Sequence, residues 1–324
     1  MNKKLMGVLI VIVVVASLIA YNEYNVSQEL TGTIKVSGAF ALYPLMVIWA
    51  QEYMKLHPKV NIEVSAGGAG KGMSDALSGL VDIGMISRDI TSQETQQGAF
   101  YVAVTEGAVV VTISDGNPAL NIILTQGITK QMFYNIFVAG NVTTWGQAVG
   151  RADITLPIHV YTRSDAAGSA DTWAKFLGKK GQGDIKGTGV YGDPGLVQAI
   201  QNDPLGIGYN NLAYAYDNST GMQVQGIKVA PIDFNHNGMI DPSENFYGNK
   251  TALVQAIQSG HYPSPPAVNY YLVTKNQFTG LTKDFAKWIL TDGQPYVPTA
   301  GYVSLTGDVL SAQLTKLEQQ GTTT

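Results

Sequence analysis

The sequence contains no cysteine, only four histidines and few charged residues. The lack of cysteine excludes disulfides, and it also excludes attachment of a lipid through an N-terminal cysteine. Charged residues make up 14% of the chain, well below the usual quarter, and the net charge is -4. Because no long basic run is present, we expect no nucleic-acid partner.

The sequence also lacks the common catalytic motifs. It has no Gly-x-Ser-x-Gly elbow and no His-Glu-x-x-His pair, and its histidines are scattered. We therefore predict that the protein is not an enzyme. The four tryptophans are expected to pack in the core rather than to form sugar platforms: Trp49, Trp145, Trp173 and Trp288.

The N-terminus differs from the rest of the chain. A basic start, MNKK, precedes the apolar run LMGVLIVIVVVASLIA, so residues 1–21 are either a cleaved signal peptide or a retained membrane anchor. Both alternatives place the body outside the cytoplasm, at the cell surface or in the periplasm. Residues 22–31 are predicted to be a polar linker, and residues 319–324 a disordered tail.

The body alternates strands and helices, which predicts an α/β fold with a parallel sheet. Thr33–Val36 is a predicted strand, and a helix after it ends at His57-Pro58. A buried strand is predicted at Ala108–Ser114, and a late strand at Tyr270–Lys275 returns the chain to the first lobe. We therefore predict that one lobe comprises residues 32–112 and 268–318, and the other residues 113–267.

Three strand-to-helix turns are built from small residues. They are Ser37–Ala41, Gly67–Gly70 and Ala166–Ser169. Backbone N–H groups at a helix N-terminus bind anions, and small side chains let an anion approach the backbone. Ordinary βα loops are the alternative, because every βα unit has such a turn. The glycine-rich turn is no P-loop, since Lys71 is followed by glycine instead of Ser or Thr.

A charged pair lies just before the third turn. Arg163 could contact an anion directly, and Asp165 could hold the guanidinium in place. The alternative is a surface ion pair of little energetic value. Ser87 and Arg88, which follow the strand-like segment DIGMI, could also face a cleft or could lie in a solvated turn.

The stretch DFNHNGMIDPSE has the spacing of a calcium loop. A strand-like segment precedes it instead of a helix, so we expect structural Ca²⁺ rather than a sensor. The alternative is an Asx-rich turn with an accidental acidic end. The predicted ligands are Asp233, Asn235, Asn237, Met239 through its carbonyl, Asp241 and Glu244.

Several motifs together resemble the solute-binding proteins of phosphate ABC transporters, the PstS family. They are SGAFALYPL, SAGGAGKGMSDALSGLVDIGMISRDI, TRSDAAGSADTW and GIGYNNLAYAY. The resemblance extends from about Thr33 to Leu314. It implies the type II periplasmic-binding-protein fold, which has two Rossmann-like lobes, a central cleft and two crossover strands. Here an apolar N-terminal helix would precede it.

The resemblance also implies a set of ligand-binding residues, with three departures. Phe40 lacks the hydroxyl that the family often has there, Ala69 stands where the family has a serine, and Ser87 stands where many members have a proton-accepting aspartate. The identity of the oxyanion therefore remains open. The implied ligand-binding residues are Ala39, Phe40, Ala41, Ala69, Gly70, Ser87, Arg163, Asp165, Ala167, Gly168 and Ser169.

These features predict a receptor that captures inorganic phosphate in a cleft and delivers it to an ABC permease. We expect a monomer, which contacts the membrane through its N-terminal segment if that segment is not cleaved. Three alternatives stay open: a receptor for sulfate, molybdate or tungstate, a surface phosphatase, and a structural protein ordered by calcium.

Overall fold

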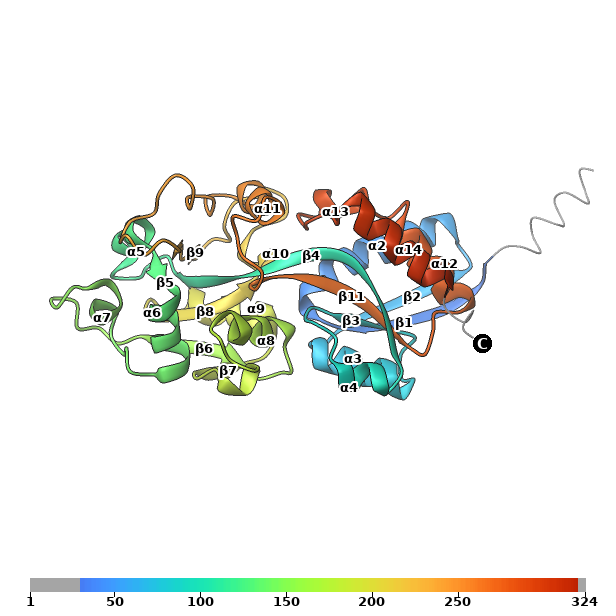
Figure 1. The fold of residues 1–324 in the computed structure, drawn as a ribbon, viewed down its shortest axis with the longest axis horizontal. Helices are drawn as coiled ribbons and strands as arrows, with labels where there is room; N and C mark the ends of the chain where they lie inside the picture. The colour runs from blue at the N-terminus through green and yellow to red at the C-terminus, as the bar shows by residue number, and fades with distance from the viewer. Residues whose placement is uncertain (1–29, 320–324) are drawn as a thin grey trace, which may run out of the picture.

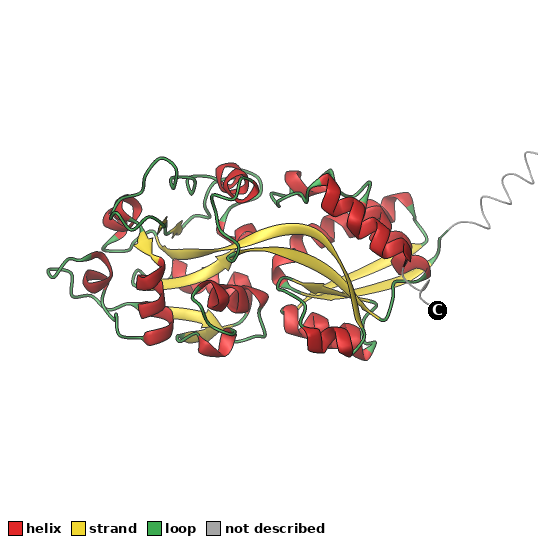
Figure 2. Ribbon diagram, in the orientation of Figure 1, coloured by secondary structure: helices red, strands yellow, loops and turns green. Residues whose placement is uncertain are grey.

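The computed structural model describes residues 30–319, which form two α/β lobes joined by two long strands (Figure 1). The joining strands β4 (Ala99–Ser114) and β11 (Ala267–Lys275) are antiparallel neighbours. The last part of β4 pairs instead with β8 (Gly206–Asn211) of the second lobe. The strands therefore form one continuous band through both lobes (Figure 2).

Lobe 1 has a sheet in the order β2-β1-β3-β11-β4, in which the first three strands are parallel. Helices α2, α12 and α14 lie on one side of this sheet, and α3 and α4 lie on the other (Figure 1). Its further elements are β1 (Gly32–Gly38), η1 (Phe40–Leu42), α2 (Tyr43–Leu56), β2 (Val60–Ala66), α3 (Ala69–Ser78), β3 (Ile83–Ile86), α4 (Ser92–Gln96), α12 (Gly280–Leu290), α13 (Tyr296–Thr299) and α14 (Gly307–Gln319).

Lobe 2 continues the sheet in the order β4-β8-β6-β7, with β9 also paired to β4. A small parallel pair, β10 with β5, lies apart from this sheet. The remaining elements are α5 (Leu120–Gln126), β5 (Ile128–Thr129), α6 (Lys130–Tyr134), η2 (Asn135–Ala139), α7 (Trp145–Val149), β6 (His159–Arg163), α8 (Gly168–Phe176), η3 (Gln182–Asp184), β7 (Thr188–Val190), α9 (Gly192–Gln201), α10 (Leu212–Ala215), β9 (Ile227–Val229), β10 (Ile232–Asp233) and α11 (Lys250–Gln258).

Strand β4 begins at Ala99, well before the predicted start at Ala108. In the sequence, Gly107 suggests that no strand runs through this position, because glycine weakens a strand. In the fold, the Tyr270 ring fills the space beside it. A β-carbon on Gly107 would lie 2.3 Å from the Tyr270 hydroxyl, so the glycine admits the ring without ending the strand.

Each lobe has its own hydrophobic core. The predicted core position of the tryptophans is confirmed, since all four are buried: Trp49, Trp145, Trp173 and Trp288. The two main clusters are separate, which is the arrangement expected of lobes that move against each other by bending β4 and β11.

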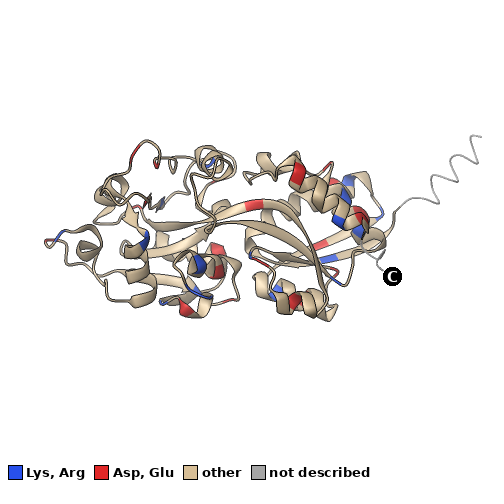
Figure 3. Cartoon of the chain, in the orientation of Figure 1, with Lys and Arg blue, Asp and Glu red and all other residues tan. Residues whose placement is uncertain are grey.

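Residues 1–21, nearly all of the predicted linker and residues 320–324 lie outside the described part of the chain. Within residues 30–319, none of the helices combines the length and the hydrophobicity needed to span a bilayer. Lys and Arg positions are scattered among Asp and Glu positions in both lobes (Figure 3).

Candidate functional site

Arg163 is the last residue of β6, and its side chain is almost completely buried at 1% exposure. Its Nε and Nη2 atoms donate hydrogen bonds to the two carboxylate oxygens of Asp165, at 2.8 and 2.6 Å. A bidentate pair of this kind fixes the plane of the guanidinium. The Asp165 side chain is 4% exposed, so this is a buried pair and not a surface ion pair.

A second carboxylate, which the sequence analysis did not identify, also binds Arg163. Asp193 is completely buried in the first turn of α9, and it accepts a 2.5 Å hydrogen bond from Arg163 Nη1. Burial opposes the charged guanidinium, but Asp193 and Asp165 outweigh it and raise the pKa of Arg163. The cluster therefore has two negative charges for one positive charge.

The first predicted turn lies over this cluster. The Phe40 ring is 5.2 Å from Arg163 Cζ and packs edge-on against Tyr191. The hydroxyl of Tyr214, from lobe 2, donates to the Phe40 carbonyl at 3.1 Å. Phe40 and Ala41 begin η1, where a helix leaves its N–H groups without intrahelical partners. These two N–H groups are therefore suited to an anion.

The glycine-rich turn of lobe 1 presses directly on lobe 2. The Gly70 N–H donates to the Ala166 carbonyl at 2.9 Å, so in this arrangement it serves the lobe contact. A β-carbon on Gly70 would lie 2.5 Å from that of Ala166, and one on Gly68 would lie 2.7 Å from Asp165 Oδ2. Glycine is therefore what permits the lobes to approach so closely.

Ser87 meets the N-terminus of α8 across the same boundary. A β-carbon on Gly168 would lie 2.4 Å from the Ser87 hydroxyl oxygen, so the two residues are in close contact. Ser169, the next residue of α8, accepts a 3.2 Å hydrogen bond from Arg163 Nη1 through its hydroxyl oxygen. At the lobe boundary Arg163 therefore contacts Ser169, and Ser87 contacts the preceding residue of α8, Gly168.

The predicted ligand-binding residues are brought together between the lobes, although not every N–H group is available. The Ala39 N–H donates to Met85 O at 2.8 Å, and the Ala167 N–H donates to Gln182 Oε1 at 2.9 Å. Ala69 is buried at the start of α3. The sequence analysis also did not identify Gln182 as part of the site. This residue stabilises the third turn, because its Nε2 donates to the carbonyls of Arg163 and Asp165.

The predicted calcium loop lies elsewhere in lobe 2, beside β5. Asp233 ends β10, and its carboxylate accepts hydrogen bonds from the backbone N–H groups of His236 and Gly238. The side-chain amides of Asn235 and Asn237 both donate to Asp241 Oδ2. The remaining predicted ligands take part differently: Glu244 accepts from the backbone of Phe234 and Asn235, and Met239 donates its N–H to Asn237 Oδ1.

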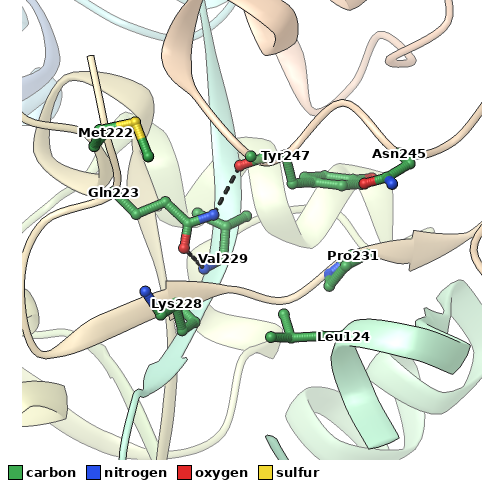
Figure 4. A pocket seen from close by; sticks show the side chains of 9 residues that line it. Leu124, Met222, Gln223, Lys228, Val229, Pro231, Asn245 and Tyr247 are labelled. Atoms are coloured by element: carbon green, nitrogen blue, oxygen red, sulfur yellow. Dashed lines mark hydrogen bonds between the residues drawn. The ribbon is translucent and has the colours of Figure 1, made fainter. Parts of the chain in front are cut away.

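Within residues 30–319, no three side chains of His, Cys, Asp or Glu form a group that could hold a metal ion. Two of the predicted loop ligands are asparagines and one is a backbone carbonyl, so the loop would depend on neutral oxygen ligands as well as on carboxylates. A surface pocket of about 430 Å³ lies in lobe 2 (Figure 4). Its lining contains Lys228 and none of the predicted ligand-binding residues, so it does not coincide with the cleft.

Known proteins match most of this chain. The family model described as "PBP superfamily domain" matches residues 25–293. The chain belongs to this superfamily. The PBP assignment confirms the fold that the resemblance implied, apart from the apolar N-terminal helix, which lies outside the described residues.

Two curated relatives match most of this PBP-superfamily chain. The phosphate-binding protein PstS of Bacillus subtilis is 25% identical over 286 residues, covering 86% of this chain and 83% of the relative. The phosphate-binding protein PstS of Methanocaldococcus jannaschii is 27% identical over 346 residues, covering 89% and 87%. The predicted resemblance to PstS proteins is thereby confirmed, and these relatives are named as binding proteins, not enzymes.

Solved structures support the same fold. A protein of Clostridium perfringens, described as a phosphate ABC transporter substrate-binding protein with bound phosphate, superposes with a TM-score of 0.68 at 21% identity. The match covers 85% of this chain and 100% of that chain. An ABC-type phosphate transport receptor from Vibrio cholerae gives a TM-score of 0.60 at 17% identity, with the same coverage.

Proposed function

We propose that this protein is an extracytoplasmic receptor that captures inorganic phosphate between its lobes and delivers it to an ABC permease. The observation that carries the proposal is the buried Arg163, fixed by Asp165 next to the N-terminus of α8 and facing lobe 1. The relatives named as phosphate-binding proteins support the same ligand class.

The donors available to an anion come from both lobes. Lobe 1 contributes the N–H groups of Phe40 and Ala41 and the Ser87 hydroxyl, and lobe 2 contributes the start of α8. A ligand that touches both sets favours the closed arrangement, because these contacts exist together only when the lobes meet. Enclosure also removes water from Arg163, which strengthens its interaction with an oxyanion.

The Asp165 carboxylate, whose Oδ2 lies beside Gly68 of lobe 1, favours phosphate over sulfate. At neutral pH phosphate retains a proton and can donate a hydrogen bond to a carboxylate, whereas sulfate has no proton to donate. Sulfate would instead meet the excess negative charge of Asp165 and Asp193 without compensation. This asymmetry supplies the discrimination that a serine at position 87 does not.

Isothermal titration of the protein with phosphate, sulfate and tungstate tests the proposal. We expect micromolar or tighter binding of phosphate, with sulfate and tungstate much weaker. Arg163→Lys keeps the charge but loses the bidentate geometry, so we expect phosphate affinity to fall about 10- to 150-fold. If the protein binds sulfate or tungstate but not phosphate, its ligand is another oxyanion. If it binds none of the three, the proposal is overturned.

Export, anchoring and oligomeric state belong to the same proposal. The apolar run within residues 1–21 and the extracytoplasmic role of a receptor support export. N-terminal sequencing of the protein from its native membrane distinguishes a cleaved signal from a retained anchor. Light scattering on the purified protein tests the expected monomer.

We also propose that residues 233–244 bind Ca²⁺ in a structural role. The spacing of oxygen side chains supports it, as does Gly238, whose φ of 79° is the left-handed conformation that the sharp turn requires. Bound Ca²⁺ would add a net stabilisation of about 2.7 kcal/mol at one hundred times its dissociation constant. Chelation should therefore lower the Tm of the parent protein. It should not change the Tm of the Glu244→Gln variant, which lacks a calcium ligand. An unchanged Tm of the parent, together with no bound calcium in equilibrium dialysis, would contradict the proposal.

A further inference from the structure

Three consecutive residues of lobe 1 meet one face of a helix of lobe 2. Ser87 contacts Gly168, Arg88 pairs with Asp171 at 3.4 Å, and Asp89 pairs with Lys175 at 2.7 Å. Positions 168, 171 and 175 of α8 are spaced by three and four residues, so they lie on the same face of the helix. The loop after β3 therefore runs along α8 in a defined register.

Arg88 is already fixed within lobe 1. Its two terminal nitrogens donate to the two carboxylate oxygens of Glu94, at 3.0 and 2.6 Å. Glu94 in turn accepts from the Thr91 N–H in the capping box of α4. Burial opposes the charge of Arg88, but Glu94 and Asp171 raise the pKa of its guanidinium. The cation is thus oriented before it meets lobe 2, which reduces the entropy lost on closure.

Asp171 is fixed within lobe 2 in the same way. Its Oδ1 atom accepts a 2.9 Å hydrogen bond from the Gln182 N–H, while Oδ2 faces Arg88. Both halves of this pair are partly buried, with the Arg88 side chain 13% and the Asp171 side chain 29% exposed. The contact is therefore less screened by solvent than an ordinary surface pair.

The second pair has the opposite polarity. Here lobe 1 provides the anion, Asp89, and lobe 2 provides the cation, Lys175. These side chains are more exposed, at 64% and 38%, so this pair alone contributes little. Alternating polarity nevertheless specifies register, because a shift in one direction would bring Arg88 toward Lys175, and a shift in the other would bring Asp89 toward Asp171.

We propose that Arg88 and Asp89 are positioning residues, which dock on Asp171 and Lys175 and so hold the Ser87 hydroxyl at the N-terminus of α8 when the lobes close. This inference rests on the proposed function, because Ser87 and α8 belong to the proposed phosphate site. Both pairs join one lobe to the other and are lost when the lobes separate. They stabilise only the closed state, and their loss should speed ligand release more than it slows capture.

Charge exchange across the lobe boundary tests the proposal. The variants are Asp89→Lys, Lys175→Glu and the double variant, which restores a pair with its charges exchanged. Arg151→Glu is the matched control, because it makes the same change of charge as Lys175→Glu in an exposed pair confined to lobe 2. Asp171→Asn tests the more buried pair while keeping an acceptor for the Gln182 N–H.

Stopped-flow measurement of phosphate release is the first readout. Each single reversal should speed release about two- to fivefold, and Asp171→Asn by at least as much. The double variant should return to the parent rate, and Arg151→Glu should not change it. Unchanged rates in the single variants, or a double variant that releases phosphate as fast as the single ones, would overturn the proposal.

The distance between lobes is the second readout, and it does not depend on phosphate. Because the chain has no native cysteine, spin labels can be placed at the exposed positions Leu80→Cys in lobe 1 and Leu156→Cys in lobe 2. The single reversals should shift the ligand-free distance distribution, and the double variant should restore it. If phosphate does not bind, the proposed function fails while this readout still decides the docking. Identical distance distributions in all variants would then reject the proposed docking of Arg88 and Asp89.

Discussion

Asp193 is completely buried and accepts a 2.5 Å hydrogen bond from Arg163 Nη1, 30 residues away in the sequence. Its other carboxylate oxygen accepts from both the backbone N–H and the side-chain amide of Asn211, at 2.9 and 2.8 Å. The carboxylate thus accepts hydrogen bonds from three N–H donors. It joins the end of β6, the start of α9 and the end of β8, which are the elements that position the site.

Replacing Asp193 by Asn should destabilise the protein. An asparagine side chain must direct an N–H donor either at Arg163 or at the donors of Asn211, so two donors would face each other. We expect the free energy of unfolding to fall by about 1.5–3 kcal/mol, the usual value of a buried hydrogen bond to a charged group. Urea unfolding at pH 7 measures the change. Asp153→Asn, at an exposed pair in the same lobe, should change it by less than about 0.5 kcal/mol. A fully stable Asp193→Asn would contradict this account.

The sequence predicts Arg163 and Asp165 as a pair because they are two residues apart at the end of a strand. It does not predict Asp193, because GDPG reads locally as the start of a helix, and nothing nearby indicates which distant side chain the aspartate meets. The contacts of Ser87, Arg88 and Asp89 escaped prediction for the same reason. Local patterns determine the strands, helices and turns, whereas contacts between lobes depend on how two separately folded cores meet.

Gly70 should make closure of the lobes more favourable. In Gly70→Ala, the new methyl group would lie 2.5 Å from the β-carbon of Ala166. Overpacking of this kind costs about 1–3 kcal/mol, so we expect phosphate affinity to fall about 5- to 150-fold. The clash exists only between lobes, and alanine favours the helix α3, so the free energy of unfolding should not fall. Titration calorimetry and urea unfolding measure the two effects separately.

The chain offers a matched rescue of Gly70→Ala. The double variant with Ala166→Gly removes the opposing methyl group and should recover most of the lost affinity. Ala166→Gly alone should bind phosphate nearly as well as the parent. If Gly70→Ala binds normally, or if the double variant does not recover, then contact between these two residues does not limit closure.

Lys250 should make stability depend on pH in a specific window. It is buried at the start of α11, where its Nζ donates to Asn218 Oδ1 and, at 3.5 Å, to the Ala300 carbonyl of lobe 1. Burial lowers the pKa of Lys250 to about 8, and Asp217 only partly opposes this. Between about pH 8 and the ordinary lysine pKa of about 10.4, the unfolded chain therefore binds more protons than the folded protein.

Within that window, raising the pH removes the cost of the buried charge, so Lys250 contributes a rise in the free energy of unfolding. Lys250→Met removes the titrating group and should remove this rise, while Lys275→Met, at an exposed lysine that ends β11, should keep it. Urea unfolding of the three proteins at pH 7 and 9.5 gives the comparison. The buried tyrosines titrate alike in all three proteins and cancel in the differences. An equal change with pH in the parent and in Lys250→Met would mean that Lys250 keeps its ordinary pKa despite its burial.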